Sequence, residues 1–300
     1  MKLLITGSSG FVGRNLTAYL MQQQVEVENL SLRHESWRSV MDKNADAIIH
    51  LAGKAHDTSN VSGENEYFEV NRDLTISLYQ EFLRSGIKDF FFFSSVKAVA
   101  DVAEGILTEK VRPNPKTPYG KSKHEAEVYL LNQTIPIGKR LFIVRPCMIH
   151  GPGNKGNLNL LYKVVKKRIP WPLTAFKNER SFLSIDNLSF LVYQILKNKD
   201  ISSGVYNFAD DQSISTNELI RIISNTLSKK PRFWNVSSEL IKNVVKIGDI
   251  LPLPLNSERL KKLTESYIVS NKKIKHALGI NRLPLTAEEG LIKTIQSFKK

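Results

Sequence analysis

The chain has 300 residues, of which 41% are hydrophobic and 24% are charged, a composition typical of a globular protein that buries a full core. Its single cysteine, Cys147, excludes a disulfide framework and a cysteine-rich metal site, so we expect no metal and a reducing, cytoplasmic setting. The net charge of +14 is spread over stretches such as KVVKKR, NKKIKH and SFKK, which we interpret as solvated helix faces rather than a nucleic-acid site.

No apolar run reaches the length of a signal peptide or a membrane span, so we expect no membrane insertion. A basic surface of this kind would still attract an anionic small substrate.

The first half of the chain alternates between strand and helix patterns. Strands are predicted at residues 2–6, 25–32, 45–53, 89–95 and 140–146, and helices at 11–23, at 65–86 and around YGKSK. This alternation predicts an α/β fold, with a Rossmann-type doubly wound parallel sheet in a dinucleotide-binding domain over residues 1–150. Residues 151–300 are predicted to form a smaller C-terminal substrate-binding domain, and residues 204–210 are expected to return to the sheet as a strand.

The stretch TGSSGFVG places Gly7, Gly10 and Gly13 between the first strand and the first helix. A pyrophosphate needs backbone N–H groups at a helix N-terminus and no Cβ where the chain approaches it. Three glycines also occur in ordinary tight turns, but this strand–turn–helix setting favours dinucleotide binding. At the end of the second strand Ser31 takes the place of the usual acid and Arg33 follows, which favours NADP over NAD; the alternative is that Arg33 is a surface residue.

Tyr119 and Lys123 are four residues apart and therefore share a helix face. An ammonium about 4 Å from a phenol supplies enough energy to bring its pKa from about 10 to about 7. The pair could therefore transfer a proton to or from a sugar hydroxyl, with Ser95 at a strand end holding the substrate oxygen. The plain alternative is a tyrosine near a helix start and a solvated lysine.

With these residues the chain resembles the extended short-chain dehydrogenase/reductases, the nucleotide-sugar epimerases, dehydratases and reductases. The motifs that carry the resemblance are TGSSGFVG, HLAG (50–53), Asn71, the serines 94–95, YGKSK, RPCMIHGPG (145–153) and ERSFLSIDNL (179–188). The resemblance implies that Tyr119 is the acid/base, that Lys123 holds the nicotinamide ribose and that Ser95 binds the reacting oxygen. The cofactor site it implies contains, besides Tyr119, Lys123, Ser31, Arg33 and the three glycines, the residues Ser9, Phe11, Val12, Leu51, Ala52, Gly53, Asn71 and Pro146.

For the substrate, the resemblance implies that Arg180 reaches the diphosphate of a sugar nucleotide, a role that suits a guanidinium; a surface ion pair with Glu179 is the alternative. Ser95, Lys97, Asn157 and Arg259 complete the substrate site that it implies. Lys97 has two possible interpretations: it contacts the substrate or the cofactor, or it is a solvated lysine at a strand end. The resemblance further implies a homodimer, because a two-helix dimer face is usual in the family.

The sequence departs from the family pattern in three places, and the third bears on which reaction the protein catalyses. Residues 31–45 are too few for the usual third strand and its helix, and Met148 stands where many members have an asparagine that contacts the substrate phosphates. Val96 and Lys97 occupy the positions where sugar 4,6-dehydratases carry an Asp-Glu pair, which argues against dehydration.

The leading hypothesis is hydride transfer at carbon 4 of a nucleotide-diphosphate hexose, expected to be UDP-linked, in surface-polysaccharide sugar biosynthesis. The stretches SSVKA and HGPGNKGNLNLLY resemble a subgroup of UDP-sugar 4-epimerases and 4-keto reductases. The open adenosine pocket favours a 4-keto reductase that uses NADPH; the alternative is a UDP-glucose or UDP-N-acetylglucosamine 4-epimerase that retains NAD. A non-catalytic dinucleotide sensor is less favoured because both Tyr119 and Lys123 are present, and a reductase of lipid or aromatic ketones would not need Arg180.

Overall fold

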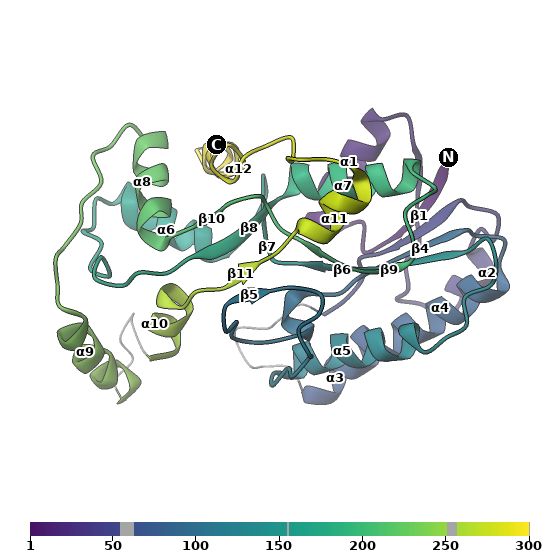
Figure 1. The fold of residues 1–300 in the computed structure, drawn as a ribbon, viewed down its shortest axis with the longest axis horizontal. Coiled ribbons are helices and arrows are strands. Elements are labelled where there is room, and N and C mark those ends of the chain that lie inside the picture. Colours follow the sequence, from purple (N-terminus) through teal and green to yellow (C-terminus); the bar gives the residue numbers. More distant parts are fainter. Residues whose placement is uncertain (55–62, 155, 251–256, 300) are drawn as a thin grey trace.

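The structure, a computed structural model, describes residues 1–54, 63–154, 156–250 and 257–299. Its centre is a six-stranded sheet in the order β2-β1-β3-β4-β6-β9, and every neighbouring pair is parallel. The predicted Rossmann-type doubly wound sheet is thereby confirmed (Figure 1). The strands are β1 (Lys2–Thr6), β2 (Glu26–Asn29), β3 (Ala47–His50), β4 (Asp89–Phe93), β6 (Arg140–Pro146) and β9 (Gly204–Phe208).

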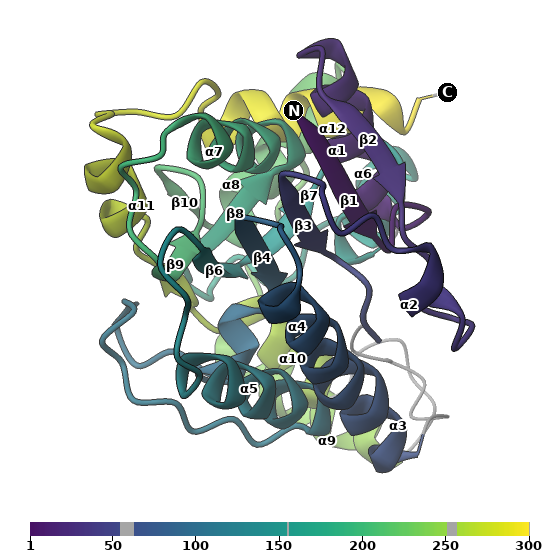
Figure 2. The same cartoon turned by 90° about the vertical axis from the view of Figure 1, so that its right-hand side faces the viewer.

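Helices cover both faces of this sheet because successive strand residues point to opposite sides. Leu3 and Ile5 pack under α1 (Phe11–Gln22) and α7 (Ile185–Lys197). Leu4 faces the other way, with α4 (Leu74–Arg84) and α5 (Pro118–Leu131). Figure 2 shows the strands between the two helix layers. The inner strands β1, β3, β4 and β6 are buried on both faces, which explains why their sequences are mainly continuous apolar runs, whereas the edge strand β2 is largely exposed.

Some predicted boundaries differ from the observed ones. The strand predicted at 25–32 is only β2 (Glu26–Asn29), and the helix predicted at 65–86 consists of α3 (Glu64–Phe68), a π-helical turn η1 (Glu69–Asp73) and α4. Between β2 and β3 the chain forms only the one-turn α2 (Trp37–Val40), and β2 lies at the sheet edge. The shortened segment therefore leaves the adenosine side of the sheet without a further strand among the described residues.

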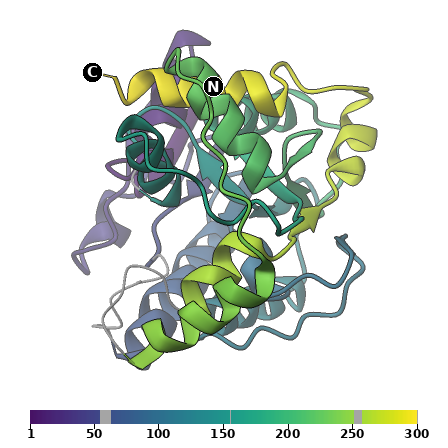
Figure 3. The ribbon, with the colours of Figure 1, turned by 90° about the vertical axis from the view of Figure 1, so that its left-hand side faces the viewer.

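A second unit lies beyond the carboxyl ends of the strands. Its three-stranded sheet, in the order β10-β8-β7, packs with its own helices around a separate apolar core that includes Trp171 and Phe182. Figure 3 views the molecule from the end that carries α9 and α10. The helices and strands not yet named are η2 (Val96–Ala98), β5 (Ile106–Leu107), β7 (Met148–His150), α6 (Asn157–Lys166), β8 (Arg180–Ser184), β10 (Ser213–Ile214), α8 (Thr216–Thr226), α9 (Ser238–Ile250), α10 (Ser257–Thr264), β11 (Ile268–Val269), α11 (Lys272–Leu278) and α12 (Ala287–Ser297).

The chain crosses between the two units more than once. β9 pairs with β6 in the large sheet, and α7 packs on α1, although both follow residue 150. The division at residue 150 thus stays a prediction. Within the described residues, no helix combines the length and the apolar character that crossing a membrane requires.

Candidate active site and cofactor groove

The loop between β1 and α1 is built so that backbone, not side chain, faces a ligand. Gly7 has φ +71°, and a Cβ there would lie 2.7 Å from the Ala52 nitrogen. A Cβ on Gly13 would lie 2.3 Å from the Gly7 carbonyl oxygen and 2.5 Å from the Ser8 Cα. Gly10 is the N-cap of α1 and donates its N–H to the Gly7 oxygen at 3.0 Å. Only glycine fits at positions 7 and 13, and the resulting cradle at a helix N-terminus fits a pyrophosphate.

This loop opens into a groove of about 630 Å³ that runs to the end of β2. The described residues that line it include no carboxylate, and Arg33 is the charged residue among them. Ser31 lies on the same wall, as does Asn29, whose side-chain oxygen accepts a hydrogen bond from the Ser8 hydroxyl at 2.6 Å. Glu28 is engaged elsewhere, 2.8 Å from the Lys2 ammonium. The pocket expected for the adenosine half of a dinucleotide therefore favours a negative group.

A buried chain of hydrogen bonds supports the floor of the groove. Thr75 donates its hydroxyl proton to the Asn71 carbonyl at 2.8 Å, so it accepts from His50 Nε2 at 2.9 Å. Because Nε2 carries the proton, His50 Nδ1 accepts from the Thr6 hydroxyl at 2.7 Å. Thr6 in turn accepts from the Ala52 N–H at 3.1 Å. The chain fixes one tautomer of His50 and connects the groove wall at Ala52 to the π-helical turn at Asn71.

Burial keeps this histidine neutral. Desolvation, assisted by the positive charge of Lys123, lowers the pKa of His50 to about 3. The hydrogen-bond directions that a neutral ring requires therefore persist over the whole range in which the protein is expected to work.

Asn71 is not among the described residues that line the groove, and its side chain connects Lys54 to Ser122. It is fully buried, accepts from the Lys54 N–H at 2.8 Å and donates to the Lys54 carbonyl at 3.1 Å and to the Ser122 hydroxyl at 3.1 Å. A Cβ on Gly53 would lie 2.9 Å from the Asn71 side-chain oxygen and 3.0 Å from Lys123 Nζ. The missing side chain at Gly53 thus brings the end of β3 against the lysine of α5.

The sequence TPYG explains how α5 begins next to Ser95. Thr117 caps the helix by accepting from the Gly120 N–H at 3.2 Å, and Pro118 suits the first turn. A Cβ on Gly120 would lie 2.5 Å from the Lys97 carbonyl oxygen, so glycine allows the helix to approach the end of β4 closely. There the Tyr119 phenol forms a side-chain hydrogen bond with Ser95, which itself accepts from the Lys97 N–H at 3.1 Å.

The electrostatics of Tyr119 differ from the sequence-based expectation. Burial raises the pKa of the phenol, and the hydrogen bond from Ser95 opposes this only in part. The Lys123 ammonium donates to the Phe93 carbonyl at 2.9 Å, and its own pKa is lowered to about 8 by burial. The expected depression of the Tyr119 pKa by Lys123 is not seen, because burial of the phenol is the largest effect and Lys123 is not among the groups that shift its pKa. Tyr119 is therefore protonated at neutral pH and ready to donate.

A buried ion pair holds α5 against β6. Arg145 Nε donates to Glu127 Oε1 at 2.9 Å, and both residues are almost fully buried. Glu127 lies one helical turn after Lys123, and its charge raises the pKa of that ammonium, against the larger effect of burial. The pair therefore contributes both to the placement of α5, which carries Tyr119 and Lys123, and to the charge of Lys123.

A smaller pocket of about 170 Å³ begins at Ser95 and contains two cations. Arg180 and Lys97 both line it, and the pKa of Arg180 is lowered by burial. Lys97 Nζ donates to the Asp101 carbonyl at 2.6 Å and lies 4.5 Å from the centre of the Tyr267 ring. Two cations beside Ser95 suit a diphosphate. The same wall carries Pro146, Cys147, Met148 and Ser181.

Of the predicted cofactor residues, Ser9, Leu51 and Ala52 line the large groove, while Pro146 lines the smaller pocket instead. Phe11 and Val12 pack against the apolar core under α1. The side chains of Asn157, in α6, and Arg259, in α10, are outside the part of the chain that the structure describes.

Sequence reasoning missed His50, Asn29 and Tyr267. His50 belongs to the quoted motif HLAG, and its place at the end of a buried strand beside glycine was a usable signal. Asn29 and Tyr267 had none, because their roles depend on contacts with Ser8 and Lys97 from other segments.

Comparison with known proteins agrees with this geometry. Residues 3–209 match the model of the NAD dependent epimerase/dehydratase family. A UDP-glucose 4-epimerase of Vibrio cholerae is 30% identical over 99% of this chain and 95% of its own length. A GDP-6-deoxy-D-mannose reductase of Pseudomonas aeruginosa is 28% identical over 75% of this chain and 79% of its own. Among solved structures, RMD from Pseudomonas aeruginosa complexed with NADPH superposes with a TM-score of 0.75 at 21% identity, covering 99% of both chains.

Proposed function

The chain belongs to the NAD dependent epimerase/dehydratase family, and from that premise we propose that it is a nucleotide-sugar 4-keto reductase. The substrate would be a UDP-linked 4-keto-hexose, and the reductant NADPH. We place the reaction in the cytoplasm, in the synthesis of sugars for surface polysaccharides, after a dehydratase that makes the 4-keto sugar.

The observation that carries the choice of NADPH is the open, carboxylate-free end of the groove. Ser31 and Arg33 are on its wall, and the described lining residues there include no acid that could bind a ribose 2′-hydroxyl. An acid would repel a 2′-phosphate, whereas a guanidinium binds one through a fork of donors. A reductase must bind NADPH and release NADP in every catalytic cycle, and an open pocket allows this exchange more readily than a closed one.

The catalytic groups are arranged to donate a proton. When bound, a reduced nicotinamide supplies the hydride. Tyr119, which burial keeps protonated, gives its proton to the carbon-4 oxygen, so that the carbonyl becomes a hydroxyl. Ser95 orients that oxygen and the phenol, and the Lys123 ammonium stabilises the phenolate that remains. Proton return to Tyr119 from solvent completes the cycle.

The two cations of the smaller pocket support a diphosphate-linked substrate. Lys97, which donates to the Asp101 carbonyl, and Arg180, from β8, both line this pocket. The ammonium and the guanidinium can both donate charge-assisted hydrogen bonds to phosphate oxygens, which supports a substrate that carries a diphosphate.

A second candidate is a UDP-hexose 4-epimerase, favoured by the similarity to the Vibrio cholerae UDP-glucose 4-epimerase over nearly the whole chain. Such an enzyme keeps its NAD bound while the keto intermediate turns over and takes the hydride back on its other face.

The cofactor content and the activity of the purified protein distinguish the reductase from the epimerase. We expect no dinucleotide to remain bound through purification, and we expect NADPH oxidation when a UDP-4-keto-6-deoxyhexose is added. Stoichiometric NAD in the purified protein, with interconversion of gluco and galacto sugars and no NADPH use, would instead identify the epimerase.

A further inference from the structure

Basic side chains that the sequence separates gather at one end of the second unit. Residues 163–171, at the end of α6, lie beside residues 227–234, after α8: the Trp171 N–H donates to the Arg232 carbonyl at 2.8 Å, and the Trp234 N–H donates to the Trp171 carbonyl at 2.8 Å. We call this region the basic surface. It consists of Lys163, Lys166, Lys167, Arg168, Lys229, Lys230 and Arg232 with the apolar residues Leu160, Ile169 and Trp234.

The surrounding sequence contains no negative charge. Residues 151–178 contain six lysines and arginines and residues 219–238 contain four, with no aspartate or glutamate in either stretch. Together they account for ten of the 14 net positive charges. The expectation that the basic residues are simply dispersed is therefore wrong for this part of the chain, because folding brings KVVKKR and KKPR together.

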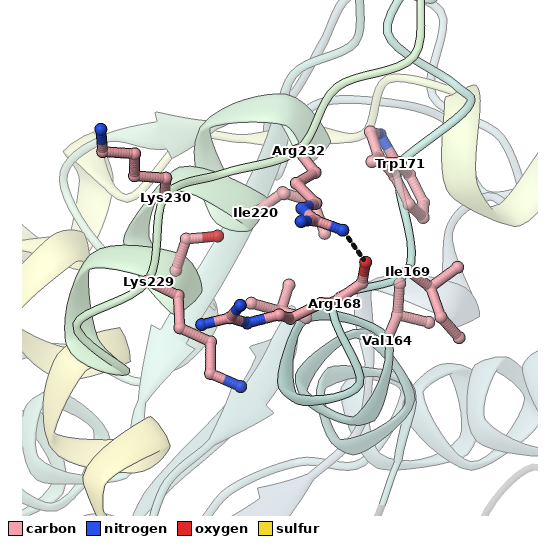
Figure 4. A pocket seen from close by; sticks show the side chains of 10 residues that line it. Val164, Arg168, Ile169, Trp171, Ile220, Lys229, Lys230 and Arg232 are labelled. Carbon is pink, nitrogen blue, oxygen red and sulfur yellow. Dashed lines mark hydrogen bonds between the residues drawn. The ribbon is translucent and has the colours of Figure 1, made fainter.

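Helix capping explains only part of this charge. The Lys229 ammonium donates to the Lys166 carbonyl at 2.6 Å. Arg232 donates to the Arg168 carbonyl at 3.4 Å (Figure 4). Both cations thus satisfy the carboxyl end of α6. Lys167 and Lys230 are exposed, and capping does not account for them.

Arg168 is placed at a cost to stability. Its φ is +56°, in the left-handed region, just after the last turn of α6. Glycine is preferred there, and the chain itself uses Gly279, with φ +66°, at the end of α11. Gln24, after α1, and Ser228, after α8, adopt the same left-handed conformation without glycine, so the backbone of Arg168 does not by itself indicate a function.

The shape of the basic surface indicates a broad partner. The hollow between Arg168, Lys229, Lys230 and Arg232 holds only about 10 Å³, too little to enclose a phosphate. Figure 4 shows the four cationic side chains around this hollow, together with the apolar side chains of Val164 and Ile220. The arrangement suits many weak contacts with a flat anionic surface rather than one enclosed ligand.

Exposed apolar side chains lie among the cations, and they favour a lipid bilayer over a nucleic acid as the partner. Leu160 is 60% exposed, Ile169 50% and Trp234 61%. Leu160 is on the same face of α6 as Lys163 and Lys167, at helical spacing of three and seven residues. Duplex nucleic acid is bound mainly through its phosphates, which require cations but no exposed aliphatic groups. Tryptophan and aliphatic side chains enter the interface of a bilayer whose anionic lipids attract lysine and arginine.

We propose that the basic surface docks the protein peripherally on an anionic lipid bilayer. α6 connects this surface to the loop after β7, whose Met148 lines the pocket that also contains Arg180. Ten helical residues rise roughly 15 Å, so the two ends of α6 separate the basic surface from that loop by about this length. This inference does not depend on which reaction the site catalyses.

Cosedimentation with vesicles tests the proposal. We expect the full chain to bind vesicles of phosphatidylcholine and phosphatidylglycerol, to leave pure phosphatidylcholine vesicles unbound, and to be released by high salt. Tryptophan fluorescence gives a second readout, because Trp37 and Trp171 are 3% and 5% exposed and Trp234 is 61% exposed. A blue shift on vesicle binding therefore reports mainly on Trp234.

The decisive variant is Arg168→Gly combined with Lys230→Ser. The glycine relieves the left-handed backbone, so folding should be preserved, while the loss of two charges should weaken vesicle binding about tenfold or more. The matched control, Lys88→Ser with Lys272→Ser, removes two exposed lysines from other parts of the molecule and should bind nearly as the wild type does. Equal weakening by both double variants, or equal binding to both kinds of vesicle, would overturn the proposal. Salt-sensitive binding of duplex DNA without vesicle binding would overturn it in favour of nucleic acid.

Discussion

Replacing Glu127 by Gln removes the charge that balances a guanidinium inside the protein. Arg145 is 4% exposed and Glu127 is 1% exposed, and an arginine does not lose its proton in a protein. The neutral amide leaves this cation buried without a counter-charge. Breaking a buried ion pair in this way costs about 3–5 kcal/mol, so we expect a large fall in the free energy of unfolding.

Glu125, two residues earlier on the same helix, provides a matched control. It also pairs with an arginine, Arg72, at 2.7 Å, but its side chain is 46% exposed. Exposed pairs contribute about 0–1 kcal/mol. Glu127→Gln should therefore destabilise the protein by at least about 2 kcal/mol more than Glu125→Gln does, as measured by urea denaturation of the two variants.

Glu127→Gln should also change the pKa of Lys123. Glu127 raises the pKa of Lys123, which burial lowers to about 8, so in Glu127→Gln the ammonium should lose its proton at lower pH. We expect the alkaline limb of the activity profile to move to lower pH, and that of Glu125→Gln to stay in place. Equal free energies of unfolding and equal pH profiles for the two variants would refute the role assigned to the buried pair.

Three further predictions concern the site. Tyr119→Phe should lower kcat by at least about 100-fold and leave the NADPH Kd nearly unchanged in a fluorescence titration; substantial remaining turnover would exclude Tyr119 as the proton donor. Arg33→Ala should raise the Kd of NADPH about tenfold, because one exposed charge-assisted contact is lost, and should leave the Kd of NADH unchanged; an equal effect on both cofactors would place Arg33 away from the 2′-phosphate. Burial lowers the pKa of Lys123 to about 8 from about 10.4 in the unfolded chain, so between about pH 8 and pH 10 only the unfolded chain holds that proton. The free energy of unfolding of the wild type relative to Lys123→Met should therefore rise with pH across this window, and a flat difference would mean that Lys123 titrates normally.

Local patterns predicted the parts of the molecule that depend on local geometry. The spacing of Gly7, Gly10 and Gly13 requires only a strand, a turn and a helix, and the apolar run before Ser95 predicts a buried strand. The spacing of Tyr119 and Lys123 likewise follows from one turn of helix. The short segment after Ser31 correctly indicated that a strand is missing beside β2.

Features that depend on distant contacts could not be predicted in this way. The His50 hydrogen-bond chain joins three elements, and the pairing of Arg145 with Glu127 depends on how α5 packs on β6. The pKa of Tyr119 was predicted wrongly because the sequence gives the distance to Lys123 along the helix but not the extent of burial. The basic surface escaped detection because Arg168 and Arg232 are 64 residues apart.

The most direct test of the proposed function follows the hydride. NADPH that carries deuterium at the transferable position is incubated with the enzyme and a UDP-4-keto-6-deoxyhexose, and the product is analysed by NMR and mass spectrometry. We predict one deuterium per product molecule, located at carbon 4, with one NADPH oxidised for each sugar reduced. A product without deuterium, formed from a UDP-hexose by protein that retains its own NAD, would contradict the account.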